Sequence, residues 1–323
     1  MSERKPVTIR LSYSLKDFCI KYNRFKALLE TEGFDAYIPR KRTPGEILLS
    51  VANRLAGTHE QDGYRYKVIV VKTHESERLI EEVVLAARLD RRNRKITDGD
   101  KVARILFDKD FGVITSFFPD TGPVWGLEDM GLDLKPCPAF LREAIKRLPE
   151  DMDVEQTLVS PSQVRGTFLR IVSSVGIPVD GILATWNLPV SQAGVAESLR
   201  RIAKQINQEA EQRVMRFDAI EICEGSDLIE DIRTDALVFA TKELEKLLLI
   251  EQEKIEVAPD PDKAHQVAMA RFSKEAEKLM VLIGQHRESL GEEIDKIDQL
   301  RKEFESLLCD FEIPMESCPK MAV

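Results

Sequence analysis

Clustered basic residues are the part of this chain whose types and spacing point most directly to a chemistry. Two short runs are rich in Arg and Lys, and a third segment alternates Tyr with Arg or Lys. Cationic side chains bind phosphate groups, and aromatic rings stack on bases, so the segments predict a nucleic-acid-binding surface if folding brings them together. The candidate residues are Arg40, Lys41, Arg42, Tyr64, Arg65, Tyr66, Lys67, Arg91, Arg92, Arg94 and Lys95.

The same residues have a structural interpretation. Loops that carry Arg and Lys are commonly just solvated, and charged side chains on an edge strand block unwanted pairing with other strands. Residues 1–100 carry 20 Lys and Arg against 15 Asp and Glu, which leaves 27 against 41 in the rest of the chain. The resulting charges of +5 and −14 are compatible with an anionic partner at the N-terminal end only.

Familiar catalytic and cofactor motifs are absent from the sequence. Neither GxGxxG nor GxxxxGK[ST] occurs, so no phosphate-binding glycine loop is predicted. The four histidines do not pair with Cys, carboxylate or one another at metal-ligand spacing. Asp218 and Glu221 could form half of a metal-dependent nuclease site, but the lysine that usually accompanies them is missing. We therefore predict no cofactor, no metal and no catalytic residue, and interpret these two carboxylates as outward side chains on a half-exposed strand.

The composition favours a cytoplasmic protein. The N-terminus has no hydrophobic signal region, and no apolar run approaches the roughly 18 residues that span a bilayer. Five cysteines lie far apart without a CxxC pair, which indicates reduced thiols rather than a disulfide framework.

Apolar periodicity divides residues 1–225 into strands and helices. Strands are predicted from the alternation or β-branched content of several segments, and helices from capping boxes at Thr43 and Ser160. We expect a helix from Ser14 to about Glu32, a polar loop over 57–63 and a short helix over 102–107. The predicted strands are 7–13, 64–72, 79–89, 112–118, 181–188 and 216–223, and the long helix over 191–214 makes the last two strands a βαβ unit that would lie parallel.

The last hundred residues read as long amphipathic helices. The first begins near Ser226 and ends near Glu256, since Pro259 and Pro261 cannot continue it. The second runs from about Asp262 to Phe311, with glycines at which it would kink or reverse. It carries a nearly heptad seam, which predicts either an intramolecular hairpin or three-helix bundle or an intermolecular coiled coil. The seam consists of Leu290, Ile294, Ile297, Leu300, Phe304, Leu307, Leu308 and Phe311.

These elements predict an α+β fold, with a mixed α/β head and a long helical C-terminal tail. The expected divisions are 1–120 for the first part of the head, 121–159 for a linker with a short helix, 160–225 for an α-β-α-β segment and 226–323 for the tail.

Three stretches together resemble an uncharacterised family of bacterial, archaeal and phage-associated proteins known as a domain of unknown function. They are Leu11–Ser14 with its helix, Leu89–Ile96 at the end of a strand pair, and Gly181–Pro189 before a long helix. The resemblance covers roughly residues 10–255, leaves the last helix outside and implies no function.

Three hypotheses of function follow. In the first, the chain is a non-enzymatic interaction or scaffold protein whose tail binds itself or a protein partner. The second is a nucleic-acid-associated protein that binds the phosphate backbone through the basic loops. The third is an enzyme whose site is assembled only by folding.

Overall fold

The structure is a computed structural model that describes residues 5–61, 64–76, 79–89, 100–108, 112–117 and 137–311. It is α+β, as predicted: among the described residues all strands lie between residues 6 and 223, and helices alone follow them. Two compact units form. The first comprises residues 1–20, 24–39 and 160–323, and the second comprises 21–23 and 40–159. The first unit therefore combines segments from both ends of the chain.

The first unit contains a four-stranded sheet. Its order is β11 (Met215–Cys223), β1 (Pro6–Leu15), β10 (Thr185–Pro189) and β9 (Ile177–Pro178). Because β10 and β11 are both antiparallel to β1, they run parallel to each other, which confirms the predicted direction. They are not neighbours, since β1 lies between them.

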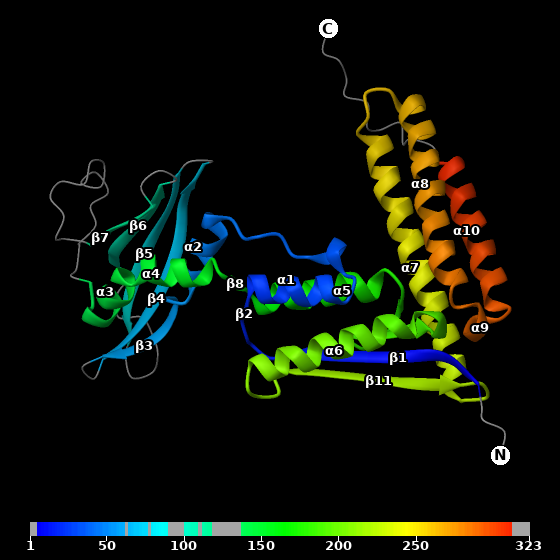
Figure 1. Ribbon diagram of the computed structural model, residues 1–323. Coiled ribbons are helices and arrows are strands. Elements are labelled where there is room, and N and C mark those ends of the chain that lie inside the picture. The colour runs from blue at the N-terminus through cyan, green and yellow to red at the C-terminus, as the bar shows by residue number, and fades with distance from the viewer. Residues whose placement is uncertain are drawn as a thin grey trace, which may run out of the picture. The chain divides into compact units, whose positions relative to one another are not determined.

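Alternation along β1 decides which face of this sheet is covered. Val7, Ile9, Leu11, Tyr13 and Leu15 are buried on one side, as expected for a strand of period two. On that side lie α1 (Tyr22–Thr31), α5 (Pro161–Ser173) and α6 (Ala193–Glu209), with two 3-10 turns at Asp35–Tyr37 and Val190–Gln192 (Figure 1). The predicted capping box at Ser160 starts α5 through reciprocal bonds with Gln163.

The C-terminal helices form a bundle within the first unit. The long helices α7 (Leu228–Glu256), α8 (Pro261–Gly284) and α10 (Glu293–Cys309) pack against one another, with the single turn α9 (Arg287–Leu290) between the last two (Figure 1). Gly291 has a φ of 56°, a left-handed conformation that glycine adopts without strain. The predicted second tail helix is therefore two helices joined by a tight reversal.

The second unit is built on a five-stranded antiparallel sheet in sequential order. Its strands are β3 (Gly57–Gln61), β4 (Tyr64–Glu75), β5 (Leu79–Leu89), β6 (Asp100–Asp108) and β7 (Gly112–Phe117). The helices α2 (Pro44–Asn53), α3 (Ala139–Lys146) and α4 (Leu148–Glu155) share one apolar core with it. Short strands β2 (Ile20–Lys21) and β8 (Leu158–Val159) complete the described elements.

Several local predictions are wrong. The expected loop at 57–63 contains β3, and the expected helix at 102–107 lies in β6, because antiparallel neighbours on both sides hold it extended. Likewise, β1 continues through Leu15, so the helix expected from Ser14 begins only at Tyr22. The strand expected from Gly181 begins at Thr185, after a turn in which Gly181 and Ala184 have positive φ.

Candidate functional site

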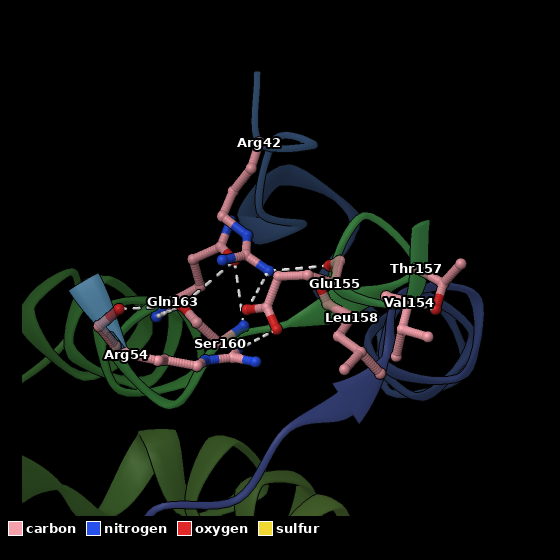
Figure 2. Close-up of polar contacts among 9 residues, drawn as sticks. Arg42, Arg54, Val154, Glu155, Thr157, Leu158, Ser160 and Gln163 are labelled. Atoms are coloured by element: carbon pink, nitrogen blue, oxygen red, sulfur yellow. Dashed lines mark hydrogen bonds and ion pairs between the residues drawn. The ribbon is translucent and has the colours of Figure 1, made fainter. Parts of the chain in front are cut away.

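Arg42, a predicted phosphate ligand, is buried in an ion-pair cluster of the second unit (Figure 2). Its Nη2 donates to Glu155 Oε1 at 2.8 Å and to the backbone carbonyl of the same residue at 2.9 Å. Arg54 bonds the other carboxylate oxygen. Only 3% of the Glu155 side chain and 10% of the Arg42 side chain are exposed. Arg42 is therefore not a solvated loop residue: its guanidinium neutralises a buried carboxylate.

The cluster controls the ionisation of Glu155. Burial alone would raise the pKa of this carboxyl, but the hydrogen bonds and positive charges of Arg42 and Arg54 outweigh that effect and hold the pKa below its ordinary value. Glu155 is thus a charged anchor between α4 and the segment that precedes α2.

The other members of the first basic run also have partners in the second unit. Arg40 Nη1 donates to Glu46 Oε2 at 3.0 Å, and the same oxygen accepts from the Thr43 N–H, completing the predicted capping box. Lys41 Nζ lies 5.3 Å from the centre of the Tyr22 ring, a cation–π distance. The run therefore contributes to local structure at each of its three positions.

The third segment lies on β4, and the second basic run lies outside the described residues. Arg65 Nε is 2.8 Å from Glu60 Oε1, the Tyr66 ring is 5.9 Å from the Phe140 ring, and Lys67 is exposed. The side chain of Tyr64 is also outside the described part. The residues that lie wholly outside it are Arg91, Arg92, Arg94 and Lys95.

Most of the seam predicted on the tail faces the inside of the bundle. Leu290, Ile297 and Leu308 are fully buried in the core shared by α7, α8 and α10, and Leu307 is 56% exposed. The three helices thus form the intramolecular bundle that was one of the two alternatives. The remaining seam residues pack partly against the same core: Ile294, Leu300, Phe304 and Phe311.

His286, at the start of α9, is a buried imidazole in the same unit. Burial lowers its pKa to about 4, an effect that the backbone of Val175 only partly opposes. In the unfolded chain a histidine takes up its proton near pH 6.5. The folded state resists protonation down to about pH 4, so its stability is full above pH 6.5 and falls as the pH drops from there towards 4.

We expect this histidine to cost the first unit about 2 kcal/mol of unfolding free energy between pH 7 and pH 5, and about 3 kcal/mol by pH 4. Urea unfolding followed by circular dichroism at several pH values measures the slope. His286→Gln should flatten it between pH 7 and pH 5, even if the variant is less stable at pH 7. An unchanged slope would show that His286 is not the group responsible.

A polar pocket of about 440 Å³ lies between the β9–β10 turn and α7. Asp235 accepts hydrogen bonds from the Asp180 N–H at 3.0 Å and from Asn187 Nδ2 at 3.1 Å. Lys242 Nζ lies 2.6 Å from Asp180 Oδ1 and lowers the pKa of that carboxyl. These polar groups already bind one another, so they connect the β9–β10 turn to α7.

Among the described residues, no group of three His, Cys, Asp or Glu is placed to hold a metal ion.

The outer edge of β11 is a different kind of surface. Lys16 N–H donates to Val214 O at 2.8 Å, and Tyr13 N–H donates to Ala184 O at 3.1 Å. In an antiparallel register, even-numbered residues of β1 therefore bond β11, and odd-numbered residues bond β10. By the same register, the even-numbered residues of β11 direct their backbone N–H and C=O groups towards β1. Its odd-numbered residues direct their N–H and C=O groups away from the sheet.

Two of the odd-numbered residues of β11 have partners at this edge. The Asn207 side chain bonds both backbone groups of Met215 at 2.7 Å, and Arg200 Nη2 approaches Ala219 O at 3.4 Å. Within the described chain, the N–H of Ala219 and both outward groups of Phe217 and Glu221 have no partner. This leaves a row of free donors and acceptors on a nine-residue strand.

A groove of about 380 Å³ runs beside this edge, between α6 and β11. Ala203, Met215 and Phe217 supply its apolar surface, and Arg200, Lys204 and Arg213 supply three cations. Lys204 and Arg213 form no ion pair with any described residue, whereas Arg200 bonds Glu197. The groove thus combines unpaired backbone groups with unneutralised positive charge.

The residues of β11 are predicted as a strand from the sequence, but the groove beside it is not. Arg200 and Lys204 stand four residues apart on one face of a predicted helix, and Arg213 precedes the next strand. That spacing was a usable signal for a cationic stripe. The sequence could not show that this stripe lies beside an open sheet edge. Which side of β11 is paired depends on β1, which lies at the other end of the chain.

The fold and the groove define an α+β protein with a helix-flanked, open sheet edge. By sequence, the chain belongs to the Family of unknown function (DUF6744), whose model matches residues 10–312. The match includes the last helix, which the resemblance left outside. No curated protein and no solved structure matches the chain. No helix among the described residues is long and apolar enough to cross a membrane.

Proposed function

We propose that this chain is a non-enzymatic binding protein that takes up an extended segment of a partner protein along the outer edge of β11. The observation that carries the proposal is the row of unpaired N–H and C=O groups at Phe217, Ala219 and Glu221. An added strand would pair with these groups, as in other complexes in which a peptide extends a sheet. Main-chain hydrogen bonds would supply the affinity and the flanking groove the selectivity.

The proposed function is still the binding of a protein partner, but the binding surface is the edge of β11 and not the helical seam of the tail. The helical seam has protein around it already, supplied by α7, α8 and α10. An association through that seam would require the bundle to open. The β11 edge needs no such rearrangement, and β11 carries no proline.

Among the residues that the structure describes, fewer contacts support the nucleic-acid alternative. Arg40, Arg42 and Arg65 hold carboxylates of the second unit, so a phosphate would have to displace a glutamate at each. Lys67 is exposed and available to a phosphate. We keep this alternative as an outcome of the experiment with peptides and an oligonucleotide described below.

Selection of extended peptides from a random display library tests the proposed function. Ala219→Pro removes the outward N–H at the centre of the open edge, and proline is tolerated where a strand N–H faces solvent. Peptides selected on the native chain should bind Ala219→Pro at least tenfold more weakly. Ala219→Ser keeps the N–H and should bind normally.

Thermal melting of both variants checks that the sheet remains folded. Selected peptides that bind Ala219→Pro and Ala219→Ser equally well would contradict a β11 edge site, as would a library that yields no binder.

A further inference from the structure

The partner segment carries acidic residues at alternate positions, we infer, and these face the cationic groove between α6 and β11. This inference rests on the proposed function and gives the chemistry of its ligand. The groove presents Arg200, Lys204 and Arg213, two of which form no ion pair within the described residues. A carboxylate is the protein side chain that complements such a surface.

Contacts between α6 and β11 fix the position of each cation. Asn207 bonds the backbone of Met215, and Arg200 approaches Ala219 O, so the two elements run in opposite directions. Lys204 lies between Asn207 and Arg200 on the helix and therefore falls opposite Phe217, which also lines the groove. The cations thus stand along the free edge from its Met215 end to Ala219.

The spacing of the cations matches that of alternate residues in a strand. Four helical residues separate Arg200 from Lys204, which is about 6 Å along the axis. Residues two apart in a strand are about 7 Å apart and point to the same face. In the added strand, residues that bond the odd positions of β11 would direct their side chains to the face on which α6 lies. Two acidic residues at positions i and i+2 would therefore meet both cations.

The far end of the groove has the opposite charge. Glu221 is exposed at the end of the free edge, and Glu197 lies one helical turn beyond Arg200. A partner residue that faces Glu221 should therefore not be acidic. The preference for acidic residues is confined to the portion of the edge between Met215 and Ala219, which also sets the direction of the charge pattern.

A second copy of this chain fits the edge less well. In an antiparallel pair of β11 edges, the Glu221 end of each copy would lie beside the cation end of the other, so a second copy would bring only one carboxylate to each groove. Among the odd-numbered residues that a second β11 presents, only Glu221 is acidic. A nucleic acid would satisfy the cations, but its phosphates supply acceptors alone, and the free edge offers carbonyl acceptors that need donors.

Fluorescence anisotropy with two synthetic peptides tests the inference on the full chain. The first has nine residues, the length of β11, with Glu at two alternate positions in the half that would lie beside Met215 to Ala219 and with Val or Thr elsewhere, and the second carries Gln in place of both Glu residues. We expect the Glu peptide to bind at least tenfold more tightly at low salt, with the difference shrinking as salt screens the charges. Ala219→Pro should weaken both peptides.

Matched variants separate the groove from general charge. Lys204→Gln combined with Arg213→Gln should remove most of the preference for Glu. Arg201→Gln makes a similar change on the same helix, but Arg201 is held by Glu32 and does not line the groove, so it should leave the preference intact.

Each other outcome overturns the inference. Equal affinities for the Glu and Gln peptides, with both weakened by Ala219→Pro, would leave the edge as a binding site but remove the acidic ligand. No binding of either peptide would reject this ligand, and the library selection would then decide the proposed function independently. Tighter binding of oligothymidylate, unaffected by Ala219→Pro, would replace the peptide with a nucleic acid. Dimerisation abolished by Ala219→Pro would assign the edge to a second copy.

Discussion

Replacing Glu155 with alanine is expected to lower the free energy of unfolding of the second unit by about 3 to 5 kcal/mol. The carboxylate is almost fully buried and bonds both Arg42 and Arg54. Removing it leaves the buried Arg42 guanidinium without a counter-charge, and breaking a buried pair from one side typically has a cost of this size. Urea unfolding followed by circular dichroism, with hydrogen exchange to localise the change to α2 and α4, provides the measurement.

Two further variants show whether burial of charge is the cause. Glu150→Ala changes an exposed residue on the same helix and should alter the free energy by less than about 1 kcal/mol. The double replacement Arg42→Met with Glu155→Met should be less destabilising than Glu155→Ala, because no buried charge is left unpaired. A loss below about 1 kcal/mol for Glu155→Ala would mean that Arg42 readily reaches solvent.

The ion pair between Arg42 and Glu155 also makes the stability of the second unit depend on pH in the acid range. Since the folded-state pKa of Glu155 is lowered, its contribution is present above the ordinary carboxyl range and is lost as the pH falls through the folded pKa. Lowering the pH should therefore reduce the free energy of unfolding of the native protein more than it reduces that of the Glu155→Ala variant.

Truncation of Ile297 to alanine should destabilise the helical bundle by about 2 to 5 kcal/mol, whereas Leu307→Ala should change it by less than about 1 kcal/mol. Both residues belong to the seam predicted from the sequence, but Ile297 is fully buried and Leu307 is 56% exposed. A buried isoleucine loses its transfer free energy and leaves a cavity, whereas a half-exposed leucine loses little of either. Urea unfolding of the helical signal compares them.

The contrast also decides between a bundle and a coiled coil between chains. If the seam were a surface for another chain, both truncations would weaken self-association, measured by analytical ultracentrifugation, and would change the stability of the monomer little. A large loss for Ile297→Ala in a chain that stays monomeric is the result expected for a bundle that covers its own apolar ridge.

Signals close together in the sequence predicted the elements most reliably. Thr43 and Ser160 each start a helix by the expected capping box, since the bonding groups are only three residues apart. The end of α7 at Glu256 follows from Pro259 and Pro261 in the same way. The apolar period of the tail required helices that cover one another, and the bundle is one of the two arrangements expected from it.

Predictions that needed distant partners were less successful. Residues 102–107 form a short apolar run that suits a helix or a strand, and only the flanking β5 and β7 make it a strand. Arg42 looked solvated because Glu155, its counter-charge, is 113 residues away in the chain. Local periodicity carries no information on either partner.

The sequence by itself determined an α+β chain, most of its helices and strands, and an amphipathic tail, because propensity, capping and periodicity act within a few residues. Tertiary structure decided which charges are neutralised and which backbone groups stay unpaired. β11 became an edge because residues from the opposite end of the chain pair with only one of its sides. Burial and strand order are non-local quantities, and the candidate binding groove depends on both.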